Sequence, residues 1–371
     1  MAGTAPPRYR RPSSVGDAAR QIFEIYARGT TAAMIAIGDA TGLWRALARG
    51  PGRPSTIAAR AGLSIRPVEE WLGAVAAARL VRYDERSGRF ALEEPYRSAL
   101  SGDSVLNVAA GARLWGSAVQ RWPLVVEAFR TGRGVPAARY LPDFPVAMDE
   151  LNRRRYDALL VRRYLPIVPF LVDRLVAGSR VLDVGCGLGR TSRLIAKAFP
   201  RSEVVGLDRS PKAIRSARAL ARQEGLTNLT FVIADAALWR AGRRFGVAFA
   251  FDALHDQADP VGVARAVYRA LEPGGLFVAI EPAAWSRLGR NIGDSGAEYL
   301  YGFSTLYCLM VSLAERGAGL GAAWGWPRAR ELLESAGFRT VRRYPVPANR
   351  LAMMLAARRP LDVPRRPRGG R

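Results

Sequence analysis

The chain is poor in the residues that build metal centres and disulfide frameworks. Its 371 residues include one histidine, His255, and two cysteines, Cys186 and Cys308. Two cysteines cannot form a disulfide framework, and one histidine with two sequence-distant cysteines lacks the ligand spacing of a usual zinc site. We therefore expect reduced thiols and no metal ion.

Long apolar runs are also missing. No stretch reaches the roughly 18 uninterrupted apolar residues that a membrane helix needs, and the first residues lack the apolar core of a signal peptide. The hydrophobic content of 49% is ample for a packed core, and the length suggests about two domains. These features predict a cytoplasmic protein that is not associated with a membrane.

Acidic residues are few relative to basic ones. The chain has 32 Asp and Glu against 56 Lys and Arg, a formal net charge of +24, and its only lysines are Lys197 and Lys212. A basic chain can bind nucleic acid, but these arginines are scattered, and heavy Arg, Ala and Gly use is typical of a GC-rich genome. We therefore expect no specific nucleic-acid partner. The proline-containing leader, 1–20, and the basic tail, 359–371, are predicted to be disordered.

A glycine-rich turn is the most informative feature that is present. Residues 181–184 have the pattern of a buried parallel strand, three alternating glycines follow at Gly185, Gly187 and Gly189, and a helical pattern begins at Arg190. Glycine lets the backbone approach a ligand, and the helix N-terminus faces it. In a dinucleotide-binding fingerprint the third glycine would come one residue later. The spacing therefore predicts a nucleotide-binding turn of a different class.

More strands that end in an acidic residue follow at the spacing of alternating strands and helices. They are predicted at 204–208, 231–236, 245–252 and 271–281, with a final strand at 351–357. This order predicts a doubly wound α/β sheet. An acid at a strand end can bind the hydroxyl groups of a ribose. The alternative for each single acid is a helix N-cap.

This series resembles the class I methyltransferases that depend on S-adenosylmethionine (SAM), and the resemblance covers residues 179–358. It implies a Rossmann-like, seven-stranded doubly wound sheet with SAM as the cofactor. By this resemblance, Asp183 and the three glycines would hold the methionine end and the sugar, Asp208 the ribose, and Asp235 with Ala236 the adenine. The implied cofactor-binding residues are Asp183, Gly185, Gly187, Gly189, Asp208, Asp235, Ala236 and Asp252.

The first third of the chain predicts a mostly helical winged-helix domain at residues 21–100. Helical patterns at 32–48, 56–61 and 67–78 precede a β-hairpin whose strands lie at 80–83 and 89–92. A winged helix can bind DNA through its second helix, but Glu69 and Glu70 in the first turn of that helix would repel phosphates. The domain resembles the dimerisation domain of plant caffeate-type small-molecule O-methyltransferases and their bacterial relatives, which implies a homodimer. Residues 101–178 are predicted to be a helical connector.

His255 is the candidate general base. It follows the strand at 245–252, and ligands bind at the carboxyl ends of the strands in such sheets. A neutral imidazole can take the proton of an oxygen acceptor. In the caffeate-type enzymes a His-Asp-Trp segment at this place carries the base, and His255-Asp256-Gln257 resembles it in part. Asp256 could orient His255 or cap a helix, and Glu281 could assist or only cap a loop.

The segment 282–326 is predicted to be a lid over the methyl acceptor, because long insertions in compact domains are often functional. Its stripe of apolar residues suggests an apolar or aromatic acceptor, although core packing explains any single member. The candidate acceptor-pocket residues are Tyr301, Phe303, Tyr307 and Met310. The sequence thus predicts a homodimeric, SAM-dependent methyltransferase that acts on a small molecule at oxygen.

Other functions stay open. His255 could be a structural residue or could only shape the site of an N- or C-methyltransferase. The protein could instead methylate RNA, or be a SAM-responsive winged-helix protein that binds nucleic acid.

Overall fold

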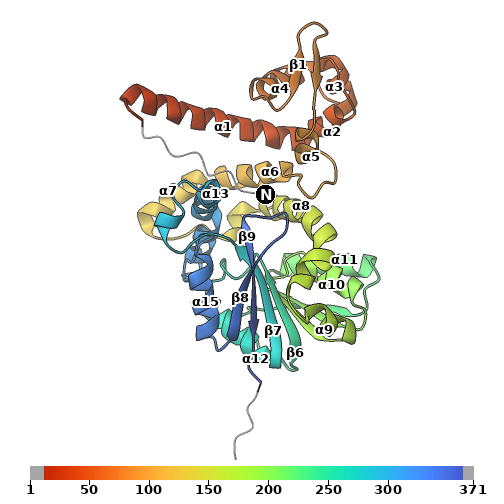
Figure 1. The fold of residues 1–371 in the computed structure, drawn as a ribbon, viewed down its shortest axis with the longest axis vertical. Coiled ribbons are helices and arrows are strands. Elements are labelled where there is room, and N and C mark those ends of the chain that lie inside the picture. The colour runs from red at the N-terminus through yellow and green to blue at the C-terminus, as the bar shows by residue number, and fades with distance from the viewer. Residues whose placement is uncertain (1–11, 362–371) are drawn as a thin grey trace, which may run out of the picture. The chain divides into compact units, whose positions relative to one another are not determined.

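A computed structural model of the protein describes residues 12–361, which form two compact units (Figure 1). The first unit comprises Met1–Pro123 and Ala137–Arg155, and the second comprises Leu124–Pro136 and Tyr156–Arg371. Residues 1–11 of the predicted disordered leader and 362–371 of the predicted tail lie outside the described residues. The rest of the leader is largely helical, because helix α1 (Val15–Thr41) already begins where the Ser14 hydroxyl accepts a hydrogen bond from the Asp17 N–H.

The first unit contains the predicted winged helix. After α1 come α2 (Leu43–Ala48), α3 (Pro54–Ala61), α4 (Ile65–Ala77) and an antiparallel hairpin of β1 (Arg82–Asp84) and β2 (Arg89–Ala91). The single helix predicted over 32–48 is wrong in one respect. It is broken at Gly42, whose φ of 77° lies in the left-handed region that ends a helix.

Two tryptophans form the centre of this winged helix. The rings of Trp44 and Trp71 meet edge to face at 4.7 Å, and they pack over Gly38, where any side chain would collide with both. Their indole N–H groups donate to the backbone carbonyls of Ile35 and Met34. Helix α4 therefore packs into the core of the unit through the residues on its apolar face, which are Val68, Trp71, Leu72 and Val75.

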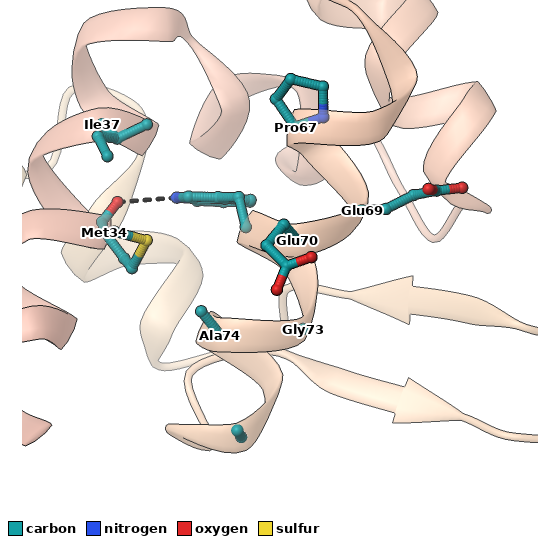
Figure 2. A pocket seen from close by; sticks show the side chains of 9 residues that line it. Met34, Ile37, Pro67, Glu69, Glu70, Gly73 and Ala74 are labelled. Carbon is teal, nitrogen blue, oxygen red and sulfur yellow. Dashed lines mark hydrogen bonds between the residues drawn. The ribbon is translucent and has the colours of Figure 1, made fainter.

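An apolar groove remains between α1 and α4 on the outside of this unit (Figure 2). Its volume is about 700 Å³, and Met34, Ile37 and Ala74 are among the residues that line it. Glu69 and Glu70 stand at its edge. Helix α1 forms one wall of the groove, and Gly38 is the only residue of this helix that is buried.

The predicted connector 101–178 is helical, but it is divided between the two units. Helices α7 and α8 each begin in the first unit and end in the second. The helical elements of this region, with the short helix before it, are α5 (Tyr96–Leu100), α6 (Ala109–Val119), α7 (Trp122–Thr131), η1 (Ala137–Tyr140), α8 (Asp143–Leu159), η2 (Leu160–Tyr164), η3 (Leu165–Ile167) and α9 (Leu171–Ala177).

The second unit is built on a seven-stranded sheet, as predicted. The strands are β3 (Arg180–Val184), β4 (Glu203–Asp208), β5 (Leu229–Ile233), β6 (Phe245–Phe251), β7 (Leu271–Pro282), β8 (Arg339–Pro345) and β9 (Ala352–Arg358). Their order is β5-β4-β3-β6-β7-β9-β8; β3 to β7 are parallel, and β9 is antiparallel to both neighbours. The order reverses next to β3, so β3 and β6 flank the crevice in which such sheets bind ligands.

Helices cover both faces of this sheet (Figure 1). Helices α9, α10 (Arg190–Ala198) and α11 (Pro211–Gln223) share one core with Val181, whereas α12 (Pro260–Ala270) and α15 (Gly325–Ser335) share the other core with Leu182. Neighbouring residues of β3 thus serve opposite faces, as the pleat of a strand requires. Among residues 12–361, no helix combines the length and apolar character needed to cross a membrane.

The predicted lid is largely helical. It contains η4 (Leu288–Arg290), α13 (Ser295–Phe303), η5 (Ser304–Cys308) and α14 (Leu309–Ala314), and α15 begins before the segment ends. The glycine-rich return after α14 packs closely on the rest of the unit. The N–H of Ala318 donates to the carbonyl of Ala258, and the Ser312 hydroxyl donates to the carbonyl of Gln257. The lid is therefore bonded to the loop that carries His255.

Candidate active site

The glycine turn after β3 combines two packed glycines with one that faces open space. All three have φ between 52° and 71°, which favours glycine. A Cβ atom at Gly185 would lie 2.6 Å from Cβ of Ala253, and one at Gly189 would lie 2.5 Å from the Phe231 ring. A Cβ at Gly187 would have no neighbour within 4 Å. The turn is thus tightly supported on its inner side and leaves room for a ligand beside Gly187.

Two predicted cofactor-binding acids hold this turn in place. Asp208, at the end of β4, accepts a hydrogen bond from the Gly187 N–H at 2.9 Å. Asp183 is only 1% exposed, and one of its oxygens accepts hydrogen bonds from the hydroxyls of Thr191 and Ser192 at 2.8 and 2.6 Å. Its other oxygen is buried without a hydrogen-bond partner. Burial raises the pKa of Asp183 to about 6.

The remaining predicted cofactor residues lie after the neighbouring strands. Asp235 and Ala236 follow β5; Asp235 is exposed, and its carboxylate accepts a hydrogen bond from the Ala237 N–H at 2.8 Å. Asp252 follows β6 at a φ of 51° and donates its N–H to the carbonyl of Ile280. The four acids, Asp183, Asp208, Asp235 and Asp252, therefore lie at or just after the carboxyl ends of β3 to β6, at the same edge of the sheet as the glycine turn.

His255 and Glu281 form a buried pair at this edge. Nδ1 of His255 lies 2.7 Å from Oε2 of Glu281, and the two residues are 4% and 0% exposed. Glu281 also accepts hydrogen bonds from the N–H groups of Leu254 and His255, at 2.9 and 3.3 Å. One carboxylate at the end of β7 therefore fixes both the loop after β6 and the orientation of the imidazole.

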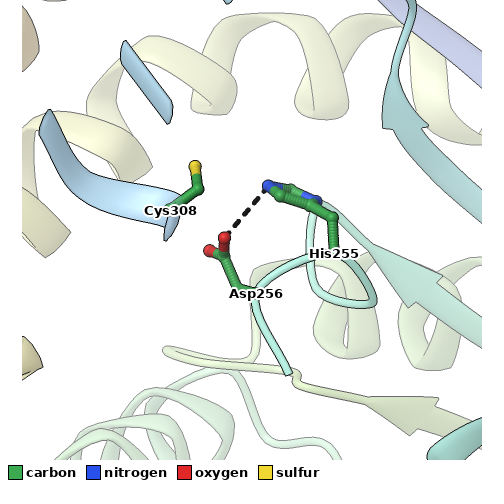
Figure 3. A group of neighbouring side chains, drawn as sticks. All are labelled: His255, Asp256 and Cys308. Atoms are coloured by element: carbon green, nitrogen blue, oxygen red, sulfur yellow. Dashed lines mark ion pairs between the residues drawn. The ribbon is translucent and has the colours of Figure 1, made fainter. Parts of the chain in front are cut away.

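Asp256 and Cys308 lie on the other side of the imidazole (Figure 3). Nε2 of His255 is 3.1 Å from Oδ1 of Asp256, an oxygen that is buried and makes no hydrogen bond. Cys308 comes from η5, and its Sγ, a nitrogen of His255 and an oxygen of Asp256 all lie within 4.8 Å of one another. Sequence spacing suggested that both cysteines are remote from the histidine. For Cys308 that inference is wrong, because the lid folds back onto the loop after β6.

The charges around His255 determine its proton affinity. Burial alone would lower the pKa of His255, but the nearby Asp256 and Glu281 outweigh burial and raise this pKa well above its ordinary value. Burial also raises the pKa of Asp256, against the opposing effect of His255. Burial raises the pKa of the Cys308 thiol to about 12. The carboxylates therefore favour the charged imidazolium.

The predicted acceptor-pocket residues differ in their surroundings. Phe303 and Met310 are buried, Tyr307 is partly buried, and Tyr301 is 37% exposed. Phe303 stacks with Tyr299 at 5.7 Å between ring centroids. The Met310 carbonyl accepts a hydrogen bond from the Val135 N–H. The side chains of Phe303 and Met310 therefore contribute to packing within the second unit, and a contact of any of the four with an acceptor stays a prediction.

Known protein families match two regions of the chain. Residues 175–337 match the family described as a methyltransferase domain, and residues 29–101 match the Rv2258c-like winged HTH domain. Trans-aconitate 2-methyltransferase of Methylobacterium radiotolerans is 37% identical over 151 residues, which are 40% of this chain and 53% of that protein. The chain thus spans about half the length of this relative.

Two solved structures resemble nearly the whole chain in fold. Human N-acetylserotonin methyltransferase in complex with SAM has a TM-score of 0.71 at 19% identity, and the match covers 94% of this chain and 99% of that one. The mitomycin 7-O-methyltransferase has a TM-score of 0.69 at 20% identity, and it covers 93% and 98%. With the observed strand order, these matches show that the chain has a methyltransferase domain at residues 175–337 and shares the fold of these structures, a winged helix followed by a seven-stranded doubly wound sheet.

Proposed function

We propose that the protein transfers a methyl group from SAM to an oxygen atom of a small apolar or aromatic molecule, with His255 as the general base. One observation supports this most directly. The glycine turn touches the loop of the base, because a Cβ at Gly185 would lie 2.6 Å from Ala253, two residues before His255. The glycine turn that would bind the cofactor therefore lies next to the buried pair of His255 and Glu281.

The residues of the turn fit the cofactor. Gly187 leaves space that a side chain would fill, and the buried second oxygen of Asp183 is an acceptor without a donor. Asp208 keeps the turn open through the Gly187 N–H, and Asp235, Ala236 and Asp252 extend the same edge. When bound, SAM supplies a methyl carbon that is activated by a positive sulfonium.

His255 would take the proton of the acceptor at Nε2. Glu281 favours the tautomer in which Nδ1 carries the hydrogen, and that tautomer leaves the Nε2 lone pair available. Glu281 and Asp256 also stabilise the imidazolium that forms. Because they raise the pKa of His255 well above its ordinary value, the neutral imidazole that acts as the base is populated at alkaline pH, and turnover should rise with pH. The aromatic character of the lid and the similarity in fold to the mitomycin 7-O-methyltransferase support a small acceptor that reacts at oxygen.

We also propose that the protein is a cytoplasmic homodimer formed through the winged-helix domain. Phe23 and Tyr26 on α1 are 69% and 65% exposed, and the groove between α1 and α4 is apolar (Figure 2). Exposed apolar surface of this kind is typical of protein interfaces. Glu69 and Glu70 at the groove disfavour DNA as its occupant.

The test is methyl transfer from labelled SAM to a panel of phenols, carboxylic acids and amines, with the products identified by mass spectrometry. We expect O-methylated products from the wild type, and tight SAM binding with little turnover from His255→Gln. Methylation of amines at equal rates by both proteins would contradict the oxygen and base assignments. A folded wild type without affinity for SAM would contradict the cofactor assignment.

A further inference from the structure

We propose that His255, Asp256 and Cys308 form a binding site for a thiophilic divalent cation, such as Zn²⁺, and that the bound cation inhibits methyl transfer. Binding itself depends only on the cluster of side chains shown in Figure 3. The inhibition rests on the proposed function, because it requires His255 to act as the base.

The donor atoms match those of zinc sites. Zn²⁺ binds thiolate sulfur at about 2.3 Å and imidazole nitrogen or carboxylate oxygen at about 2.0–2.2 Å, so ligand atoms around one ion lie about 3–4 Å apart. The three donor atoms here lie within 4.8 Å of one another. Small rotations of the Asp256 and Cys308 side chains can close the remaining difference. Three protein ligands would leave a fourth position open.

The surroundings of the cluster support a cation. Glu281 holds Nδ1 of His255 at 2.7 Å, which is the carboxylate–histidine arrangement that orients metal-binding imidazoles. Oδ1 of Asp256 is buried, and Nε2 of His255, at 3.1 Å, is the charged group that offsets its loss of solvation. A cation at this place would compensate the charges of Glu281, which is buried, and of Asp256, whose side chain is 26% exposed, next to the single imidazole of His255.

Two fixed elements carry the ligands. His255 and Asp256 lie on the loop after β6, and Cys308 ends η5 in the lid. The hydrogen bonds Ser312 Oγ to the Gln257 carbonyl and Ala318 N–H to the Ala258 carbonyl join the lid to this loop. The ligand set is therefore partly preorganised, which lowers the cost of binding.

Cation binding would remove the base. His255 releases its Nε2 proton and Cys308 its thiol proton to the solvent, and the freed Nε2 lone pair and the thiolate bind the cation. Nε2 can then no longer accept a proton from the methyl acceptor. Inhibition should be relieved by a chelator, because no covalent bond within the protein changes.

The test measures metal binding by a spectroscopic signal that does not depend on methyl transfer. Co²⁺ is added to the full chain under reducing conditions, and the sulfur-to-cobalt charge-transfer absorption is recorded; Zn²⁺ affinity follows from competition. We expect one site per chain in the wild type. Cys308→Ser should abolish the absorption and weaken Zn²⁺ binding at least tenfold, whereas Cys186→Ser, which changes the other buried cysteine, should keep both.

Asp256→Asn, with Cys308 intact, should also weaken Zn²⁺ binding, and a cooperative thermal unfolding transition without added SAM verifies that each variant is folded. Absence of the absorption in the folded wild type, or its persistence in Cys308→Ser, would overturn the metal site. Full activity of the wild type at saturating Zn²⁺ would overturn the inhibition. If the wild type bound Co²⁺ but not SAM, the proposed function would fail while the metal site stood.

Discussion

Replacement of single glycines by alanine should separate the cofactor cradle from the packing of the fold. Gly187, Gly189 and Gly225 all have φ between 52° and 71°, so alanine at each costs about 1–2 kcal/mol of stability through left-handed strain. Only Gly189 adds a collision, because the new Cβ would lie 2.5 Å from the Phe231 ring and 3.0 Å from Cβ of Ala217. Such overpacking costs about 1–3 kcal/mol more.

SAM affinity should follow a different order from stability. A Cβ at Gly187 or at Gly225 has no neighbour within 4 Å, so both variants should lose the same small amount of stability. Gly187 lies in the proposed cradle, whereas Gly225 follows α11 and precedes β5, at the amino end of that strand. We expect Gly187→Ala to weaken SAM binding at least tenfold and Gly225→Ala to leave it unchanged.

Stability is measured by thermal and urea unfolding, and SAM affinity by isothermal titration calorimetry. Gly189→Ala should be the least stable of the three variants. Equal SAM affinity of the Gly187→Ala variant and the wild type would refute the reasoning, because the open space beside Gly187 would then not receive the cofactor. Equal losses of affinity in Gly187→Ala and Gly225→Ala would attribute the effect to backbone strain.

Four further predictions follow from the site and the first unit. His255→Gln should lower turnover by about 10²–10⁴-fold with SAM affinity retained; an unchanged rate contradicts the base role. Glu281→Gln should lower turnover by a similar factor, because its amide N–H would face Nδ1 of His255 and move the imidazole hydrogen to Nε2. If the variant reached the wild-type rate at alkaline pH, this change of tautomer would be excluded. The pKa of Asp183 is raised from 3.8 to about 6 in the folded state, so its contribution to stability is complete below pH 3.8 and lost as the pH rises through about 6. Asp183→Asn should therefore gain roughly 2–3 kcal/mol of stability relative to the wild type between pH 4 and pH 7. A difference in free energy of unfolding between the two proteins that is the same at both pH values in urea would contradict this. Phe23→Glu should convert the dimer to a monomer while SAM affinity stays intact, as judged from the molar mass in light scattering. An unchanged molar mass would exclude Phe23 on α1 from the interface.

Much of the second unit could be predicted because strong local signals coincide with its tertiary roles. The strands β3 to β7 are apolar runs, and the glycines between β3 and α10 occupy positions whose positive φ favours glycine. Strand β8 was not located, since this edge strand, Arg339–Pro345, has three arginines and is mostly exposed. An edge strand needs no apolar face on the open side, and it therefore leaves a weak sequence pattern.

The site was predictable only in part, for a related reason. His255 and Glu281 could be placed because each follows a strand, and strands that are neighbours in the sheet bring their ends together. Cys308 follows no strand; it lies in a helical segment that returns to the His255 loop through contacts of Ser312. No spacing rule relates its position to that of His255. Tertiary packing of the lid decides that contact.

The base strength of His255 and the attraction of the site for cations have the same origin. Glu281 and Asp256 supply a buried and a partly buried carboxylate to a single imidazole, and Glu281 is fixed by its bonds to the backbone of Leu254 and His255. Positive charge is therefore stabilised at Nε2, whether it arrives as a proton from an acceptor or as a metal ion. Asp256→Asn should accordingly weaken both effects together. Removal of the Cys308 sulfur should weaken cation binding alone, which makes Cys308 the residue that separates the two.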